Sequence, residues 1–409
     1  MKKYNLIVVG GGISGIAAAV SAAREGMKVL LAEKFGSLGG AMSNSLVYPF
    51  MANNYGPNKV QLSRGIFEEM TQRKEKYNDT SWECYKFVFD DMITEAGVDV
   101  LFHATVFDVK KEGRLLKSVF VATKSGVMEI EADYFIDTSG DGELIAMAGC
   151  DFQLGREADG LSQPMTTCFR MSNVDIEQFK QDKEMLQEKY KQAREEGRIS
   201  NPRENILVFL GVGEGIVHFN TTRIVKHSPV EPFEVSLAEI ESRKQIWEIV
   251  SFLKENSKAF KDSCIISIAS HIGVRESRKL KGEYILTVDD LMQKVSFEDT
   301  IALGRRGIDI HSPDGTGTYT YSFKQDEYYQ IPYRSLLPKE FDNMLVAGRC
   351  LSAEHAAHSA VRIMPICACM GEATGIAVAV AAETGKNVHT IDVKKLREKL
   401  TEKGAVLEV

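Results

Sequence analysis

The feature that most constrains this 409-residue chain is a run of glycines between a short apolar segment and an alanine-rich one. Leu6–Val9 predicts a fully buried strand, and Ile13–Glu25, which has Ala and Ile at helical spacing and Gly26 after it, predicts a helix. Lys28–Ala32 predicts a second strand that ends at Glu33. Because a strand–helix–strand order gives parallel strands, the fold class is α/β.

The glycines between the first strand and the helix form the pattern G-x-G-x-x-G at Gly10, Gly12 and Gly15. Gly10 is expected to make the tight turn, Gly12 to let backbone approach a pyrophosphate, and Gly15 to let helix and strand pack closely. The N-terminus of the helix then binds the phosphates. Glu33, 18 residues after Gly15, ends the second strand, where a carboxylate accepts hydrogen bonds from a ribose diol. The pattern therefore predicts dinucleotide binding.

A second glycine-rich loop, Lys34–Ala41, follows Glu33 and would let backbone pass close to the far half of a long ligand. The order strand, GGGxxG, helix, glycine, strand, glutamate and then G-x-x-x-G-G resembles the pattern of the glutathione-reductase-like flavoproteins. The resemblance implies FAD as the cofactor and a Rossmann-like FAD-binding domain.

Later motifs extend this resemblance over nearly the whole chain, to the FAD-dependent oxidoreductases, which include relatives of the FAD-binding part of heterodisulfide reductase. These motifs are Thr138–Gly142, Gln163-Pro164, Asn220–Arg223, Arg275–Arg278, Ile331–Arg334, Val346–Arg349, Met364-Pro365 and Met370–Gly375. The resemblance implies that Gly348, Gly371 and Gly375 line the cofactor. A helix N-terminus near Pro365 would stabilise negative charge on a reduced flavin.

The residues predicted to bind FAD come from the first glycine turn, from Glu33 and the loop after it, from three of the later motifs and from Val106. They are Gly10, Gly12, Ile13, Ser14, Gly15, Glu33, Lys34, Gly39, Gly40, Ala41, Val106, Thr138, Gly140, Asp141, Gly348, Arg349, Gly371 and Gly375.

The densest group of candidates for the reaction centre is the stretch after Gly348. His355 or His358 could act as a general acid or base, because histidine titrates near neutrality. Arg362 could hold a carboxylate or enolate oxygen by a bidentate contact. The alternative for the histidines is a structural role between cofactor loops. Their spacing also suits a metal, but no third ligand lies nearby in the sequence, so no metal site is predicted.

Two further candidates are Arg275, which with Arg278 could form an anion pocket, and Tyr333, which could donate a proton to a carbanion. For each, the alternative is structural: Arg–Glu pairs that tie a sheet edge to the FAD-binding domain, or simple packing of the tyrosine. Cys367 and Cys369 are interpreted as buried small hydrophobes, because a disulfide across one residue is strained.

The chain is expected to form two domains. Residues 1–150 and 339–409 form the FAD-binding domain, and residues 151–338 form an inserted α+β substrate domain with a mixed or antiparallel sheet. Within the first domain, Val98–Val109, Leu115–Thr123 and Val127–Ala132 predict antiparallel strands, with Asp133–Asp137 as a further strand.

Composition excludes several classes of protein. A formal net charge of −7 argues against a nucleic-acid binder, which needs a basic surface. The 7 cysteines are scattered without CxxC pairs, which indicates reduced thiols in a cytosol. No uncharged apolar segment reaches the length of a membrane span, and the first residues do not resemble a signal peptide, so no membrane partner and a cytoplasmic location are expected.

These observations predict an FAD-dependent oxidoreductase that transfers a hydride between flavin and a small organic substrate. One complete dinucleotide fingerprint is present, so a separate nicotinamide domain is not expected. Electrons would come from the substrate, from transiently bound NAD(P)H or from a redox protein. The alternative is an electron-transfer subunit that passes electrons to an iron–sulfur or other redox partner.

Overall fold

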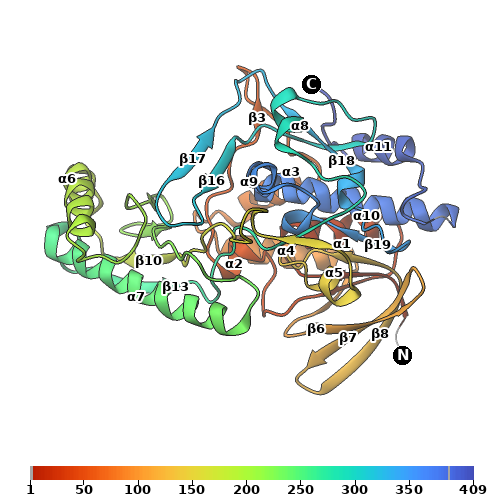
Figure 1. Ribbon diagram of the computed structural model, residues 1–409, viewed down its shortest axis with the longest axis horizontal. Helices are drawn as coiled ribbons and strands as arrows, with labels where there is room; N and C mark the ends of the chain where they lie inside the picture. Colours follow the sequence, from red (N-terminus) through yellow and green to blue (C-terminus); the bar gives the residue numbers. More distant parts are fainter. Residues whose placement is uncertain (1–2, 386) are drawn as a thin grey trace.

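A parallel sheet forms the centre of the larger part of the molecule (Figure 1). The computed structural model describes residues 3–385 and 387–409. The parallel strands lie in the order β5 (Asp99–Leu101), β2 (Val29–Ala32), β1 (Lys3–Val9), β8 (Gly126–Asp137) and β19 (Met344–Val346). Their carboxyl ends share one edge, where an α/β sheet binds its ligand. The predicted α/β class, with a parallel sheet of Rossmann type, is confirmed.

Strand β8 pairs with different neighbouring strands along its two halves. Its first half pairs antiparallel with β7 (Leu115–Thr123), which pairs with β6 (Thr105–Glu112), and its second half lies between β1 and β19. The predicted antiparallel strands are therefore present. The predicted division between Ala132 and Asp133 is wrong, because one continuous strand changes partner there.

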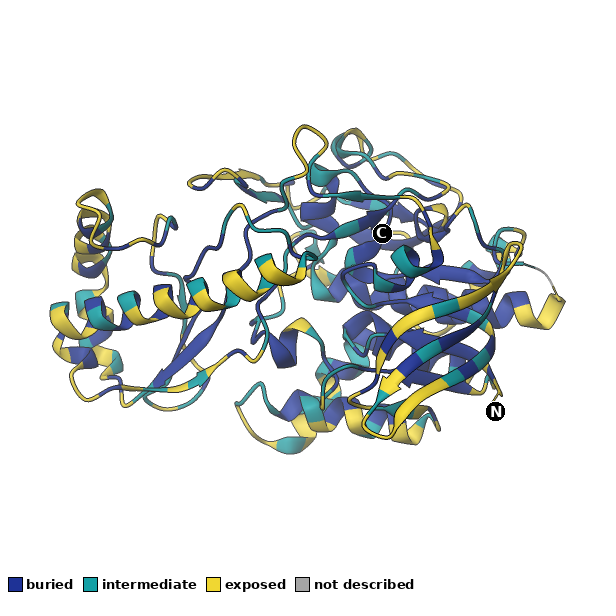
Figure 2. Ribbon diagram, turned by 60° about the horizontal axis from the view of Figure 1, so that its bottom comes forward, coloured by how far each residue is buried: buried dark blue, intermediate teal, exposed yellow. Residues whose placement is uncertain are grey.

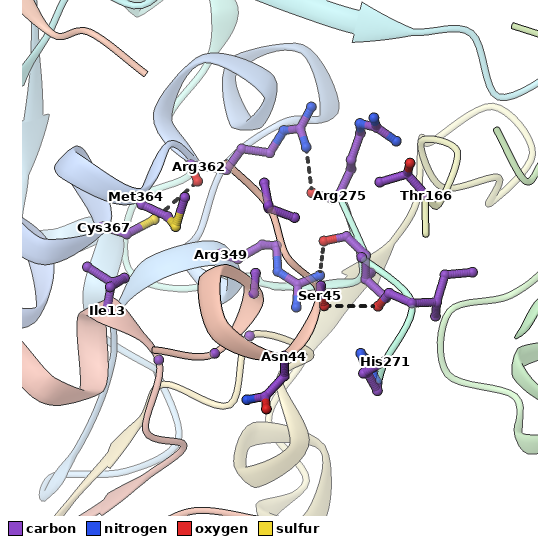
Figure 3. A pocket seen from close by; sticks show the side chains of 18 of the residues that line it. Ile13, Asn44, Ser45, Thr166, His271, Arg275, Arg349, Arg362, Met364 and Cys367 are labelled. Atoms are coloured by element: carbon purple, nitrogen blue, oxygen red, sulfur yellow. Dashed lines mark hydrogen bonds between the residues drawn. The ribbon is translucent and has the colours of Figure 1, made fainter. Parts of the chain in front are cut away.

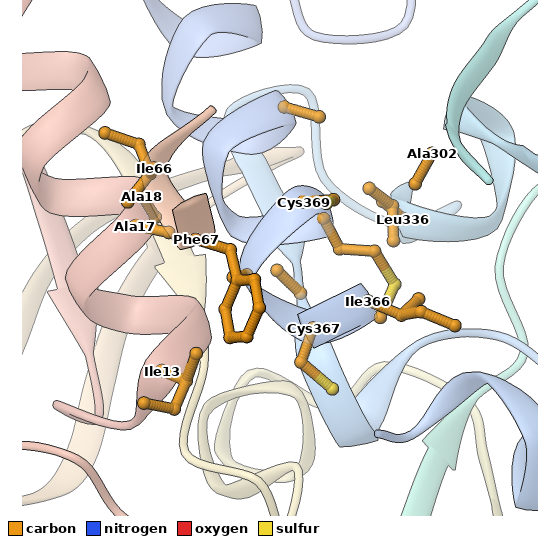
Figure 4. Packing of buried hydrophobic residues seen from close by; sticks show 14 of the residues in the cluster. Ile13, Ala17, Ala18, Ile66, Phe67, Ala302, Leu336, Ile366, Cys367 and Cys369 are labelled. Atoms are coloured by element: carbon orange, nitrogen blue, oxygen red, sulfur yellow. The ribbon is translucent and has the colours of Figure 1, made fainter. Parts of the chain in front are cut away.

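Two helices cross closely beside the parallel sheet, α1 (Ile13–Arg24) and α10 (Met364–Thr384). Their side chains pack with Ile66 and Phe67 of α3 (Ile66–Lys74) in the main hydrophobic core (Figure 4). By length and composition α10 could cross a membrane, but its apolar window is 94% buried inside the molecule. It is the central core helix of the fold.

The predicted insertion contains an antiparallel sheet. Its order is β11 (Val208–Phe209), β12 (Val217–Phe219), β10 (Phe169–Ser172) and β13 (Cys264–Ile268). Helices α6 (Ile176–Glu195) and α7 (Pro232–Asn256) pack with alternate residues of these strands, such as Phe169 and Phe219, in a second core. The intervening residues, such as Arg170 and His218, therefore lie on the opposite face of the sheet.

The residues of the predicted insertion, 151–338, belong to more than one hydrophobic core. The core under α6 and α7 contains residues between 169 and 260. Residues from Leu286 to Leu337 instead join the core of α1 and α10. Figure 2 shows this larger core as a dense group of buried helices and strands, with exposed residues on the outer faces. Only the first part of the predicted insertion thus packs as a separate unit.

The remaining elements are short segments that connect or cover these two cores. They are α2 (Ala41–Asn44), β3 (Asn54–Tyr55), β4 (Val60–Gln61), α4 (Cys84–Glu95), α5 (Glu143–Ala148), β9 (Phe152–Leu154), β14 (Arg278–Leu280), α8 (Val288–Gln293), β15 (Thr300–Gly304), β16 (Ile308–His311), β17 (Thr318–Tyr321), β18 (Tyr329–Pro332), α9 (His355–Val361) and α11 (Val393–Glu402).

Candidate active site

A cavity of 920 Å³ runs from the carboxyl ends of β1, β2 and β8 to the antiparallel sheet of the insertion. Its volume is at the upper end of the range of about 300–1,000 Å³ for small-molecule and cofactor pockets. Its lining includes both Gly12, in the first strand-to-helix turn, and Phe209 of β11, so the two parts of the chain share one space. We call the region of this cavity around Gly12 the dinucleotide end. The opposite region, which is lined by several arginines, is called the arginine end.

The dinucleotide end is formed by the turn Gly10–Ser14, by Glu33, by Gly39-Gly40 and by Thr138–Asp141. Helix α1 begins after Gly12 without a side-chain cap. The first backbone N–H groups of a helix have no partner inside the helix, and the dipole makes this end attractive to anions. The dinucleotide end thus offers backbone donors to a phosphate.

The three glycines of the fingerprint have three different surroundings. Gly10 has φ +101°, and a Cβ there would lie 2.6 Å from the carbonyl oxygen of Thr138. At Gly15 a Cβ would overlap the carbonyl oxygen of Gly10, so this glycine allows helix and strand to pack. At Gly12 the nearest atom is 3.9 Å away, on Gly40, so the absent side chain leaves open space in the cavity.

Glu33 is 4% exposed and fixes the turn from the end of β2. One carboxylate oxygen accepts a hydrogen bond of 2.6 Å from the N–H of Gly11, and the other accepts one of 2.8 Å from the N–H of Phe35. The side chain lines the cavity, as the sequence predicts. It therefore orients the glycine turn as well as presenting negative charge to the cavity.

A second helix N-terminus faces the middle of the cavity. Helix α10 begins after Ile363 with no side-chain cap and no acidic residue in its first turn. Ile363, Met364 and Cys367 line the cavity (Figure 3). This is the helix start that the sequence places near Pro365, and its dipole favours negative charge at this point.

These features fit FAD. The space at Gly12 lies beside the uncapped start of α1, which suits a pyrophosphate. Asn44 also lines the cavity, and its buried Nδ2 has no hydrogen-bond partner among the described residues. A buried donor without a partner costs about 1–3 kcal/mol, so a ligand acceptor there would be stabilising.

Most of the residues predicted to bind FAD line the cavity. They are Gly10, Gly12, Ile13, Ser14, Glu33, Lys34, Gly39, Gly40, Ala41, Val106, Thr138, Gly140, Asp141 and Arg349. Lys34 lies 2.8 Å from Glu143, and Arg349 lies 3.0 Å from Asp141, so both cations are held by carboxylates at the cavity wall.

Gly15, Gly348, Gly371 and Gly375 are not among the lining residues, because each allows a close approach of backbone or side chain instead. A Cβ at Gly371 would overlap the carbonyl oxygen of Ser14, and one at Gly375 would overlap that of Ala18. A Cβ at Gly348 would overlap the hydroxyl of Ser14. The structure thus gives Gly348, Gly371 and Gly375 a packing role between α1, α10 and the Gly348 turn, and their contact with the cofactor stays a prediction.

Three candidates for the reaction centre lie outside the cavity lining. His358 is fully buried, and its Nε2 lies 2.7 Å from the carbonyl oxygen of Arg349. His355 pairs through Nδ1 with the buried carboxylate of Glu276 at 2.8 Å. The hydroxyl of Tyr333 donates to the carbonyl oxygen of Val388 at 2.9 Å. Each side chain has a structural partner, which favours the structural alternative, although Nδ1 of His358 is buried without a partner among the described residues. The acid–base role of these residues stays a prediction.

Arg275 and Arg362, the other two candidates, do line the cavity and lie next to each other (Figure 3). Nη1 of Arg362 donates to the carbonyl oxygen of Arg275 at 3.2 Å, and Nη2 donates to Gln163 at 3.0 Å. Nη1 of Arg275 donates to the carbonyl oxygen of Pro164 at 2.6 Å.

The sequence reasoning missed most of the surroundings of these two arginines. Arg203, Arg223 and Arg306 also line the cavity, with the carboxylates Glu204 and Asp309 and the imidazole of His311. We define the arginine end as Arg203, Arg223, Arg275, Arg306 and Arg362. Arg223 was noted only as part of a family-like motif. Arg203 and Arg306 carry no local signal, because each lies in a separate loop.

His311 at the arginine end is neutral. Nη2 of Arg223 lies 3.2 Å from its Nδ1, and an arginine can only donate, so this nitrogen accepts. Burial, followed by the charges of Arg275 and Arg362, lowers the pKa of His311 far below its usual range. The ring therefore serves as an acceptor that positions Arg223.

The cysteines are free thiols in the described residues. Cys367 and Cys369 are both buried, as predicted, and burial raises the pKa of each thiol to about 12. Within the same residues, no group of three or more His, Cys, Asp or Glu side chains has an arrangement that would hold a metal ion.

Comparison with known proteins places the chain among flavoproteins. The family model described as FAD dependent oxidoreductase matches residues 5–400. Glutathione reductase of Debaryomyces hansenii is 37% identical over 92 residues, which are 21% of this chain and only 18% of that protein.

The solved structures that align with nearly the whole chain share little sequence with it. A geranylgeranyl bacteriochlorophyll reductase-like protein of Thermoplasma acidophilum is 16% identical, with a TM-score of 0.49 over 99% of this chain and 85% of that one. A flavoprotein/dehydrogenase of Cytophaga hutchinsonii is 14% identical, with a TM-score of 0.48 over 97% and 82%. The p-nitrophenol 4-monooxygenase of Pseudomonas putida is 12% identical, with a TM-score of 0.45 over 99% and 87%.

Proposed function

Since the chain belongs to the FAD-dependent oxidoreductase family, we propose that it transfers a hydride between bound FAD and a small organic substrate. The substrate would occupy the cavity under the antiparallel sheet of the insertion. The family membership supports an oxidoreductase that uses FAD. The hydride transfer and the size of the substrate are the parts that we propose.

The observation that carries this proposal is the continuity of the cavity. Gly12 and Glu33 lie at its dinucleotide end, and Thr166, Asn220 and Phe209 from the insertion lie at the other. A dinucleotide that starts at α1 and ends beside the first turn of α10 would leave the space under the insertion for a second molecule. Both molecules would then share one enclosed site, as a direct transfer requires.

The residues of this chain would bind and orient the cofactor. The start of α1 and the space at Gly12 would receive the pyrophosphate, and Glu33 would face the ribose. The first turn of α10, at Ile363 and Met364, would lie beside the redox-active ring. When bound, FAD supplies the two-electron chemistry, because the protein side chains have none of their own to offer.

The charges around the middle of the cavity favour the reduced state of such a cofactor. The uncapped N-terminus of α10 places a partial positive charge there, and the side chain of Arg349 lies close by. Cys367 is also at this position, but its raised pKa keeps the thiol protonated at neutral pH. A reaction through a thiolate of Cys367 is therefore not part of the proposal.

Anaerobic titration of the purified holoprotein tests the proposal. The visible absorption of oxidised flavin is followed while organic acids, alcohols, NADH and NADPH are added one at a time. We expect at least one small molecule to bleach the flavin completely, with one oxidised product formed for each flavin reduced. Bleaching only by a redox protein, with no response to any small molecule, would contradict direct transfer and favour the electron-transfer alternative.

A further inference from the structure

We infer that the arginine end binds the anionic group of an organic acid, a carboxylate or a phosphate ester, as the substrate. This inference rests on the proposed function, because it names the chemical class of the molecule in that site. It is carried by the position of the arginines, by their unused donors and by the shortage of carboxylates around them.

The arginines come from separate segments that converge on one end of the cavity. Arg203 precedes β11, Arg223 follows β12, and Arg275 precedes β14. Arg306 lies between β15 and β16, and Arg362 caps the end of α9. Arg203 and Arg223 are 7% and 1% exposed, so these are not the solvated cations of an outer surface.

Two of the five arginines have a carboxylate partner. Nη1 of Arg223 lies 3.1 Å from Glu204, and Nη2 of Arg306 lies 3.3 Å from Asp309. Among the described residues, no ion pair joins Arg203, Arg275 or Arg362 to a carboxylate. Buried charges are normally paired, so this end of the cavity has an excess of positive charge that an anion would offset.

The unpaired arginines also keep hydrogen-bond donors free. In residues 3–385 and 387–409, the side-chain hydrogen bonds of Arg203 use only Nε, to Asn205 at 3.2 Å. Those of Arg275 use only Nη1, to Pro164. Nε of Arg362 is buried and has no partner in the same residues. Free guanidinium donors in a cavity match the acceptor oxygens of carboxylates and phosphates.

Mutual repulsion among the arginines is visible in their electrostatics. Burial, followed by the charges of Arg362, Arg203 and Arg223, lowers the pKa of Arg275. Burial also lowers the pKa of Arg203 and of Arg362. An anion bound among them would remove this penalty, whereas a neutral molecule would leave it in place.

The arginine end is not needed to bind the phosphates of the cofactor. The phosphates of a dinucleotide are already matched by the start of α1 and the glycine turn. Leu207 and Phe209 line the cavity in the segment that follows Arg203, and they would contact an apolar body. The combination fits a small organic acid with its charged group among the arginines.

Binding to the oxidised holoprotein tests this inference without requiring turnover. Calorimetry and flavin difference spectra would compare benzoate with benzamide, succinate with succinamide, and inorganic phosphate. We expect at least one anion to bind at least ten times more tightly than its neutral counterpart, or, for phosphate, to bind saturably. Equal affinity of acid and amide, with no binding of phosphate, would overturn the inference.

Variants of the arginines test whether these side chains cause the anion binding. Arg275→Gln and Arg362→Gln should each weaken anion binding at least tenfold, and Arg275→Lys should restore part of it. Arg198→Gln, at an exposed arginine paired with Glu196, is the matched control and should change nothing. Unchanged anion affinity in both cavity variants, with FAD still bound, would overturn the inference. If a Gln variant fails to retain FAD, the Lys variant gives the comparison.

The outcomes separate the inference from the proposed function. Anion binding that depends on Arg275 and Arg362, without bleaching by any small molecule, would support the arginine site and contradict hydride transfer. Bleaching by a neutral substrate alone, with no anion bound, would support hydride transfer and overturn the arginine site.

Discussion

The two ends of the cavity present different chemical groups to a ligand. The phosphate-binding part of the dinucleotide end is made of backbone, with glycines at Gly10 and Gly12 and the free N–H groups of α1, and this part lies within one strand–turn–helix segment. The arginine end is made of side chains from five separate segments. The first end needs only local geometry, whereas the second exists only after the insertion has packed against the FAD-binding part.

Because of this difference, the two ends are suited to different ligands. Backbone donors at a helix start bind phosphate without reading the rest of the ligand, which suits a cofactor shared by many enzymes. Guanidinium groups from scattered segments can be rearranged without loss of the cofactor site, which suits a substrate. The predictions below test whether the two ends are energetically separate.

The largest effect is expected from filling the dinucleotide end. In Gly12→Val the new side chain meets open cavity rather than protein, because the nearest atom to a Cβ is 3.9 Å away. FAD affinity should fall on the order of 100-fold, about 2.7 kcal/mol, while the free energy of unfolding of the apoprotein changes little. Arg198→Gln, at an exposed arginine paired with Glu196 away from the cavity, is the control. An unchanged dissociation constant for FAD in Gly12→Val would place the pyrophosphate elsewhere.

Lowering the pH is expected to reduce the stability of the fold through His311, which lies at the arginine end. The folded state lowers the pKa of His311, so the unfolded state binds more protons below pH ~6.5, and stability present above that pH is lost as the pH falls. At pH ~5 this one histidine would cost about 2 kcal/mol. Denaturant titrations at both pH values should show a smaller loss in His311→Asn, which keeps an acceptor for Arg223. An identical loss in the variant would contradict the neutral ring.

Glu33→Gln tests the link between the acid and the glycine turn. The amide oxygen can replace one acceptor but not both, so either the N–H of Gly11 or that of Phe35 loses its partner. We expect FAD to bind about tenfold more weakly, which corresponds to about 1.4 kcal/mol. Fluorescence titration of the apoprotein with FAD measures this. Equal affinity would show that the carboxylate has no part in cofactor binding.

The smallest effect is expected for FAD binding in Arg275→Gln. If the two ends are separate, this variant should bind FAD as the unmodified protein does, although its affinity for anions falls. Titration of the apoprotein with FAD gives the comparison, with Arg198→Gln as the control. A large loss of FAD affinity would mean that Arg275 belongs to the cofactor site and that the comparison of the two ends fails.

The sequence predicts the dinucleotide end well because its causes are local. Gly10 and Gly12 act through the turn that they form, and Glu33 ends the next strand of the same strand–helix–strand unit, so their spacing along the chain is enough to place them. Gly371 and Gly375 show the limit of this reasoning. The sequence shows that a small residue is needed there, but not whether the neighbour is a cofactor or helix α1.

The sequence predicts an anion-binding role for Arg275 and Arg362, but the complete arginine end could not be predicted because its members are far apart in the sequence. Arg203 and Arg306 have no motif around them, and only the packing of the insertion brings them together with Arg362. His358 shows the opposite case, in which the sequence favours a role that the contacts of the side chain do not support. It lies in a dense stretch of polar residues beside the cofactor loops, but its position on α9 turns the ring toward the carbonyl of Arg349.

A crystal structure of the protein with FAD and a bound carboxylate tests the central claim most directly. We predict the pyrophosphate at the start of α1 beside Gly12, the redox-active ring beside Ile363 and Met364, and the carboxylate within hydrogen-bond distance of Arg275 or Arg362. A ring at the Glu33 end, or a carboxylate bound away from every arginine of the arginine end, would contradict it.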